Sequence, residues 1–128
     1  MDLTLRLLEG NLAVARLKND TALPAWLDMN SKPLVCAMRT SDELSIVCPE
    51  EVVPSNVLSE KGWRAFRIVG TIDFALTGVL ASVLNPLAEA KVGIFALSTF
   101  DTDYILVRVE KLGQARAVLE KQFRIEDR

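Results

Sequence analysis

The sequence predicts an α+β fold, in which two helices pack on one face of a mainly antiparallel sheet. Residues 63–125 read in order as strand, helix, strand, strand, helix, strand. The helices are recognised by apolar residues three and four positions apart, and the strands by short apolar runs bounded by turn residues. A helix that twice returns the chain to one sheet is typical of the ferredoxin-like βαββαβ arrangement.

The first half of this unit is an extended run at residues 64–69, a sharp corner at residues 70–73 and a helix. The apolar residues of the helix recur at helical spacing and so form one stripe. The stripe comprises Leu76, Val79, Leu80, Val83, Leu84 and Leu87. Pro86 lies inside this pattern, where it removes a backbone hydrogen bond. Since the stripe continues beyond it, we expect the helix to kink there rather than end.

The second half of the unit is a hairpin followed by a helix and a closing strand. Residues 92–97 and 104–109 form two apolar strands, joined by the polar tip 98–103. Residues 113–122 carry apolar side chains at helical spacing. Residues 123–125 supply a short final strand.

The N-terminal half also contains strands. Residues 3–8 and 12–17 alternate apolar and polar side chains, as two short strands or one bent strand do. Residues 34–39 and 44–48 are a second hairpin candidate, and a proline directly after it ends its second strand. This half therefore repeats the later unit in a reduced form.

Residues 49–62 are the predicted linker, because they hold two prolines, two serines and a glycine. We therefore expect two modules in the chain. Residues 1–60 form a smaller, degraded module, and residues 61–128 form the complete βαββαβ unit.

Composition excludes several classes of protein. The chain has 15 basic and 17 acidic residues, a balance that argues against binding to nucleic acid. Its apolar runs are short and interrupted by charge, so we expect no membrane span. The first residues lack the basic start and apolar core of a signal peptide, which favours a cytoplasmic location. Cys36 and Cys48 are then expected to be reduced thiols that behave as small apolar residues.

The chain contains no histidine. This removes the usual general base, the usual activator of a serine or cysteine nucleophile and the commonest metal ligand. Two cysteines without histidine make a poor zinc site, and no glycine-rich phosphate loop occurs. We therefore expect neither catalysis, nor a cofactor, nor a bound metal.

Two stretches carry side chains that could meet a ligand. Asp73 precedes the first helix, where it could cap the helix, and the free amides of such a helix start also attract anions. Asp101 and Asp103 lie in the hairpin tip, where small polar side chains commonly bond to local backbone. Asp103 could instead hold a cationic group such as an amino-acid ammonium or guanidinium. Two carboxylates are too few to hold calcium.

Three segments together resemble an ACT domain, namely residues 70–74, 86–89 and 94–107. The most specific string is Ser-Thr-Phe-Asp-Thr-Asp-Tyr-Ile-Leu-Val at 98–107. More narrowly, the chain is similar to small bacterial ACT proteins related to the eukaryotic cytosolic arginine sensors called CASTOR. The resemblance covers about residues 63–125 closely and the N-terminal, ACT-like half more weakly.

The resemblance implies a regulatory protein without catalysis that binds a free amino acid, arginine or another, at an interface between ACT modules. The residues that it places at the ligand are Thr71, Ile72, Asp73, Phe74, Gly93, Ile94 and Asp103. It also implies a protein-partner surface at the hairpin tip, which would include Phe100 and Asp101.

Two residues depart from the ligand-binding repeat of the sensors. Asp73 replaces a glycine, and Leu76 replaces an acidic residue of the first helical turn. These departures favour an alternative function, a ligand-free interaction module that forms a homodimer through its sheet or helix faces.

Overall fold

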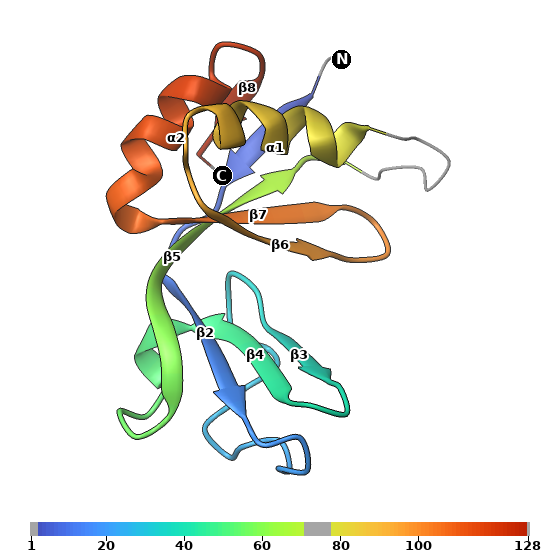
Figure 1. The fold of residues 1–128 in the computed structure, drawn as a ribbon, viewed down its shortest axis with the longest axis vertical. Coiled ribbons are helices and arrows are strands. Elements are labelled where there is room, and N and C mark those ends of the chain that lie inside the picture. Colours follow the sequence, from blue (N-terminus) through green and yellow to red (C-terminus); the bar gives the residue numbers. More distant parts are fainter. Residues whose placement is uncertain (1–2, 71–77, 128) are drawn as a thin grey trace. The chain divides into compact units, whose positions relative to one another are not determined.

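The computed structural model describes residues 3–70 and 78–127. The chain forms two compact units (Figure 1). We call Met1–Glu9 with Arg64–Arg128 the helical unit, and Gly10–Trp63 the strand unit. The modules expected at residues 1–60 and 61–128 stay a prediction about how the chain divides into related repeats. Among the described residues, no helix combines the length and the apolar character needed to cross a bilayer.

The helical unit contains the predicted α+β arrangement. Its elements are β1 (Thr4–Leu7), the second part of β5 (Leu58–Ile68), α1 (Val79–Glu89), β6 (Ile94–Ser98), β7 (Asp103–Arg108), the short helix η2 (Val109–Lys111), α2 (Leu112–Leu119) and β8 (Arg124–Glu126). The strands follow the order β8-β1-β5-β7-β6. Strand β1 lies antiparallel to β5 and parallel to β8, so it separates two strands of the βαββαβ sequence.

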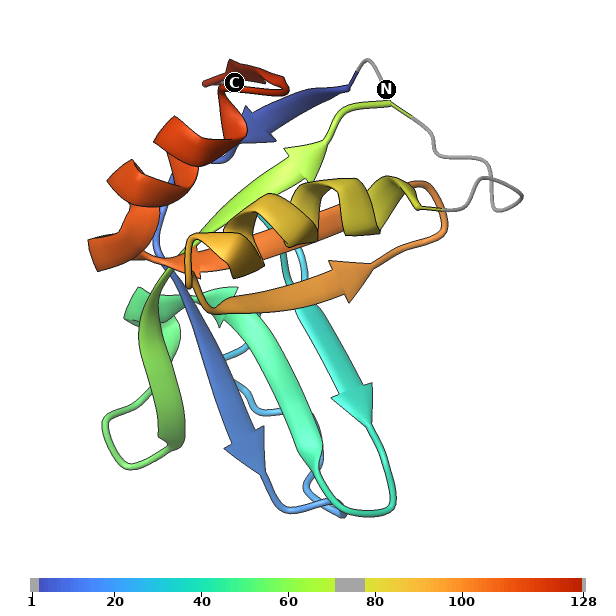
Figure 2. The same ribbon diagram turned by 45° about the horizontal axis from the view of Figure 1, so that its top comes forward.

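The core of the helical unit lies between its sheet and its two helices, which cover the same face (Figure 2). Alternate strand residues point toward the helices, and apolar residues of α1 and α2 meet them. The buried members include Leu5, Phe66, Val83, Leu87, Ile105 and Leu119.

Helix α1 runs without interruption through Pro86 to Glu89. The expectation that the helix passes this proline is therefore confirmed, and the kink itself stays a prediction. The position of the helix start was predicted wrongly. Helix α1 begins at Val79, after Gly78 in a left-handed conformation (φ 78°), so Asp73 does not occupy its N-cap. Asp73 itself lies outside the described residues. Glycine has no Cβ, so Gly78 adopts this left-handed conformation without strain and lets the chain turn sharply into the helix.

The strand unit is an antiparallel sheet of the order β3-β4-β2-β5. Its elements are β2 (Leu12–Leu17), β3 (Cys36–Arg39), β4 (Leu44–Pro49), the short helix η1 (Glu50–Val52) and the first part of β5. The predicted β3–β4 hairpin is confirmed, and its second strand ends at Pro49 as expected.

The predicted linker at residues 49–62 is wrong over its last five residues, because β5 begins at Leu58. These residues pair with β2, and the register shifts between Leu12 and Val14. Gly62 lies at this irregularity with φ 80°, and its N–H donates to Oε1 of Glu50 at 2.8 Å. A glycine with positive φ is typical of a β-bulge. Residues 58–62 have the composition of a linker and lack the apolar pattern of a strand. They form a strand because they pair with β2 in the tertiary structure.

The two cysteines lie on opposite faces of the strand-unit sheet. Both are free thiols, as expected from the sequence. Cys36 pairs with Val47, whereas Cys48 is the next residue along β4, and successive strand residues point to opposite faces. Cys48 is fully buried and belongs to the core of the unit. Its burial, together with the negative charge of Glu51, raises the pKa of the Cys48 thiol to about 11, and burial also raises the pKa of Cys36.

This difference predicts the reactivity of the thiols. At pH 8 a thiol with a pKa of about 11 is ionised to roughly one part in a thousand, and the thiolate is the reactive form. We expect Ellman's reagent to titrate Cys36 in the folded protein and Cys48 only after unfolding. A Cys36→Ser variant should release almost no colour before denaturant is added. Equal rates for two thiols in the folded protein would contradict the burial of Cys48.

Candidate functional site

Three parts of the helical unit meet at one edge, which we call the hairpin edge. It is formed by the end of β5, the start of α1 and the turn between β6 and β7, residues 99–102 (Figures 1 and 2). Thr102 joins two of these features, because its Oγ1 donates a hydrogen bond of 2.6 Å to the carbonyl of Ile68. Thr102 is only 3% exposed. The tip of the hairpin is therefore anchored to the end of β5.

The turn itself is closed by hydrogen bonds between two threonines. The N–H of Thr99 donates to the carbonyl of Thr102 at 2.8 Å, and the N–H of Thr102 donates to Oγ1 of Thr99 at 3.2 Å. Phe100 and Asp101 form the apex of the turn, and Phe100 is 80% exposed. The tip is thus a rigid turn that presents an aromatic ring and a carboxylate at its surface.

Asp103 is held differently from Asp101. It is half-buried, and its Oδ1 accepts a hydrogen bond from the hydroxyl of Ser98 on the paired strand. Asp103 shares a face of β7 with Ile105 and Val107, which pack in the core under the helices. The carboxylate therefore lies on the helix-covered face at the hairpin edge, with a fixed orientation.

Gly93 and Ile94 lie at the other end of the same hairpin. Ile94 pairs with Val107, whereas Ser98 pairs with Asp103. Four steps along a strand correspond to roughly 13 Å. The structure therefore does not bring Gly93 and Ile94 together with Asp103 within one helical unit. Both Gly93 and Ile94 are exposed.

The remaining predicted ligand residues are Thr71, Ile72, Asp73 and Phe74, and all four lie outside the described residues. In the part of the chain that the structure describes, no three acidic or cysteine side chains gather as a metal site would require.

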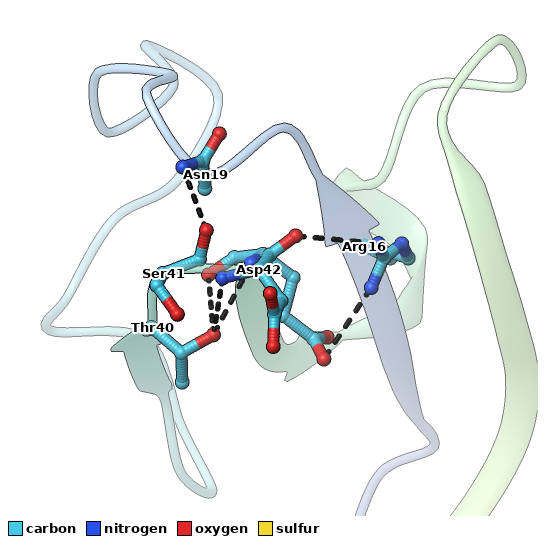
Figure 3. Close-up of polar contacts among 6 residues, drawn as sticks. Arg16, Asn19, Thr40, Ser41 and Asp42 are labelled. Atoms are coloured by element: carbon cyan, nitrogen blue, oxygen red, sulfur yellow. Dashed lines mark hydrogen bonds and ion pairs between the residues drawn. The ribbon is translucent and has the colours of Figure 1, made fainter.

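Sequence reasoning missed a second polar site, in the strand unit. The turn between β3 and β4 is closed by Oγ1 of Thr40, which accepts from the N–H groups of Asp42 and Glu43 at 3.1 and 3.2 Å. Two side chains then reach the turn from the region where β2 ends (Figure 3). Asn19 donates to the carbonyl of Ser41 at 2.8 Å, and Arg16 donates to the carbonyl of Asp42 at 3.3 Å. No motif marks this site, because its residues come from segments distant in sequence.

A family model described as an ACT domain matches residues 58–121, which are 64 of the 128 residues. The chain belongs to the ACT domain family. The matched residues include β5, both helices and the β6–β7 hairpin, so the ACT domain of this protein contains the hairpin edge. The fold and the family predicted from the sequence are both confirmed. A second family model, which describes an N-terminal domain, matches residues 10–56.

Relatives of this ACT domain protein include the cytosolic arginine sensors for mTORC1. Subunit 1 of the sensor from rat is 35% identical over 82 residues, which are 59% of this chain and 25% of the relative. The human protein of the same name is 34% identical over 87 residues, which are 62% of this chain and 26% of the relative. The chain thus spans about a quarter of the length of these relatives.

Solved structures share the fold. A crystal structure of a protein from Agrobacterium tumefaciens is 36% identical, covers 100% of this chain and 95% of its own, and superposes with a TM-score of 0.92. The aspartate kinase of Clostridium acetobutylicum is 13% identical, covers 88% of this chain and 33% of its own, and has a TM-score of 0.64. This second likeness shows the fold alone.

Proposed function

We propose that this ACT domain protein is a non-catalytic regulatory module that binds a free amino acid. The observation that carries the proposal is the fixed carboxylate of Asp103 at the hairpin edge, in a domain whose sequence relatives are named arginine sensors. A carboxylate whose orientation is already set loses little freedom when it accepts a cationic donor. The cytosolic location in the names of the relatives supports the same location for this protein.

The proposed ligand is held at its two ends by different groups. Asp103 accepts from the cationic end, an ammonium or a guanidinium. The backbone of the corner Thr71–Phe74 meets the amino-acid part, and Gly93 and Ile94 contribute main-chain groups. Because Gly93 and Ile94 lie roughly 13 Å along the hairpin from Asp103, one amino acid does not reach both in the same helical unit. The proposed site therefore lies at an interface between ACT modules. One copy of the chain contributes Asp103, and a second copy contributes Gly93 and Ile94.

Asp103→Asn tests the proposal. We expect arginine or another amino acid, at millimolar concentration, to raise the melting temperature of the original protein, because a ligand that binds only the folded state stabilises it by mass action. The Asp103→Asn variant should lose most of that shift, because an amide carries no charge to pair with a cation.

Asp101→Asn is the matched control. Asp101 lies two residues away at the apex of the same turn and is exposed, so its neutralisation should leave the shift unchanged. An amino-acid panel that moves the melting temperature of no form of the protein would remove the support for amino-acid binding.

A second function is favoured by the hairpin apex. Phe100 is 80% exposed beside Asp101, and large exposed aromatic side chains are enriched where proteins meet a partner. Within the described residues, β6 pairs only with β7 and so forms an edge of its sheet. The alternative is a ligand-free interaction module that forms a homodimer. Light scattering distinguishes the two functions, because a ligand-free interaction module should have the mass of a homodimer both with and without amino acids.

A further inference from the structure

A surface pocket of about 270 Å³, which is open to solvent and which we call the cavity, lies in the strand unit beside the tethered β3–β4 turn. Its walls are Arg16, Leu17, Lys18, Asn19, Asp42 and Leu58. They come from the end of β2, the loop after it, the β3–β4 turn and the first residue of β5. Arg16 and Leu58 are directly paired across β2 and β5 and so stand side by side on one face of the sheet.

The walls of this cavity are held in place before any ligand arrives. Arg39 binds the loop after β2, with Nη1 donating to the carbonyl of Asn19 and Nη2 to the carbonyl of Thr21 at 2.7 Å. The N–H of Thr21 donates to the carbonyl of Lys18 at 3.1 Å. Asn19 and Arg16 also donate to the β3–β4 turn (Figure 3), so the loop after β2 and the turn that line the cavity are tied to each other. Binding sites for small molecules are usually preformed in this way.

The charges in the cavity are of both signs. The guanidinium of Arg16 is already paired, with Nη1 lying 3.3 Å from Oε2 of Glu43. The ammonium of Lys18 and the carboxylate of Asp42 remain. Within the described part of the chain, these two groups form no ion pair with each other or with a neighbour, although both line the same cavity. The residues that line the cavity thus include one cation and one anion that are not already in an ion pair.

We propose that this cavity binds a small zwitterion, namely an α-amino acid with an apolar side chain. Its carboxylate pairs with Lys18 and its ammonium with Asp42, while its side chain lies on Leu58, which is 71% exposed. A simple anion is repelled by the carboxylates of Asp42 and Glu43, and a simple cation is repelled by Arg16 and Lys18. Only a ligand that carries both charges is complementary to the cavity. The volume lies just below the range of pockets for drug-sized ligands, which suits a small metabolite. This site is independent of the proposed site at the hairpin edge.

The test is a titration of the full chain with L-leucine, followed by two-dimensional ¹⁵N NMR. Saturable shifts are expected for amides at residues 16–19, 41–43 and 58, with a dissociation constant on the order of 1 mM, because the charges are exposed to water. Two analogues of leucine each carry one charge: 4-methylpentanoate lacks the ammonium, and 3-methylbutylamine lacks the carboxylate. Each should bind at least about tenfold more weakly.

Variants separate this site from the hairpin edge. Asp42→Asn and Lys18→Met should each weaken the shifts at least about fivefold while the spectrum stays that of a folded protein, and Asp103→Asn should not change them. The inference is overturned if leucine shifts no amide of the cavity, if the one-charge analogues bind as well as leucine, or if shifts occur only at residues 93–103. That last result would leave the proposed function at the hairpin edge intact.

Discussion

Replacing Phe66 by alanine is expected to lower the free energy of unfolding of the helical unit by about 3–5 kcal/mol. Phe66 is fully buried on β5, directly opposite Leu7 of β1, and packs in the core beneath the two helices. Its loss removes apolar contact area and leaves a cavity that the surrounding strands fill only in part. Urea denaturation followed by circular dichroism measures the change.

Phe100→Ala is the matched control, because it makes the same substitution at the exposed apex of the hairpin. Its effect on the free energy of unfolding should stay within about 0.5 kcal/mol. The same variant then tests the apex as a partner surface, since any loss of association cannot be attributed to unfolding. Similar destabilisation by both substitutions would contradict the core assigned to the helical unit.

Replacing Thr102 by valine is expected to cost about 1–3 kcal/mol, because the buried carbonyl of Ile68 loses its hydroxyl donor. Valine has nearly the same shape as threonine, so the loss reports the hydrogen bond rather than packing. The bond ties the hairpin tip to the end of β5. We therefore also expect faster hydrogen exchange at the amides of residues 99–103, which report local opening of the tip.

Thr102→Ser keeps the hydroxyl and removes only the methyl group, so it should retain most of the stability and the slow exchange at the tip. If serine and valine destabilise the protein equally, the methyl contact and not the hydrogen bond fixes the tip. If neither variant changes exchange, the anchor between Thr102 and Ile68 does not control the hairpin edge.

The candidate site shows where sequence reasoning succeeds and where it ends. The string at residues 98–107 predicted the hairpin, because its turn residues and apolar alternation are local signals, and its resemblance to ACT proteins indicated the family. The resemblance carried by this string already assigned Asp103 to the ligand and Asp101 to a partner surface. The structure adds a physical difference between them, since Asp103 is half-buried and bonded to Ser98, whereas Asp101 lies at the exposed apex. Thr102 gave no signal at all, because its partner Ile68 lies 34 residues earlier.

By itself, the sequence determined the order of helices and strands, the polar turns between paired strands and the membership of the ACT domain family. The elements and turns follow from the spacing of apolar side chains and from turn residues close together in the chain, whereas the family follows from the match of residues 58–121 to the family model. The tertiary structure alone decided that residues 58–62 extend β5, that β1 lies between β5 and β8, and that Lys18 and Asp42 line one cavity. Each of these depends on pairing between segments far apart in sequence, where backbone hydrogen bonds and packing override local preference.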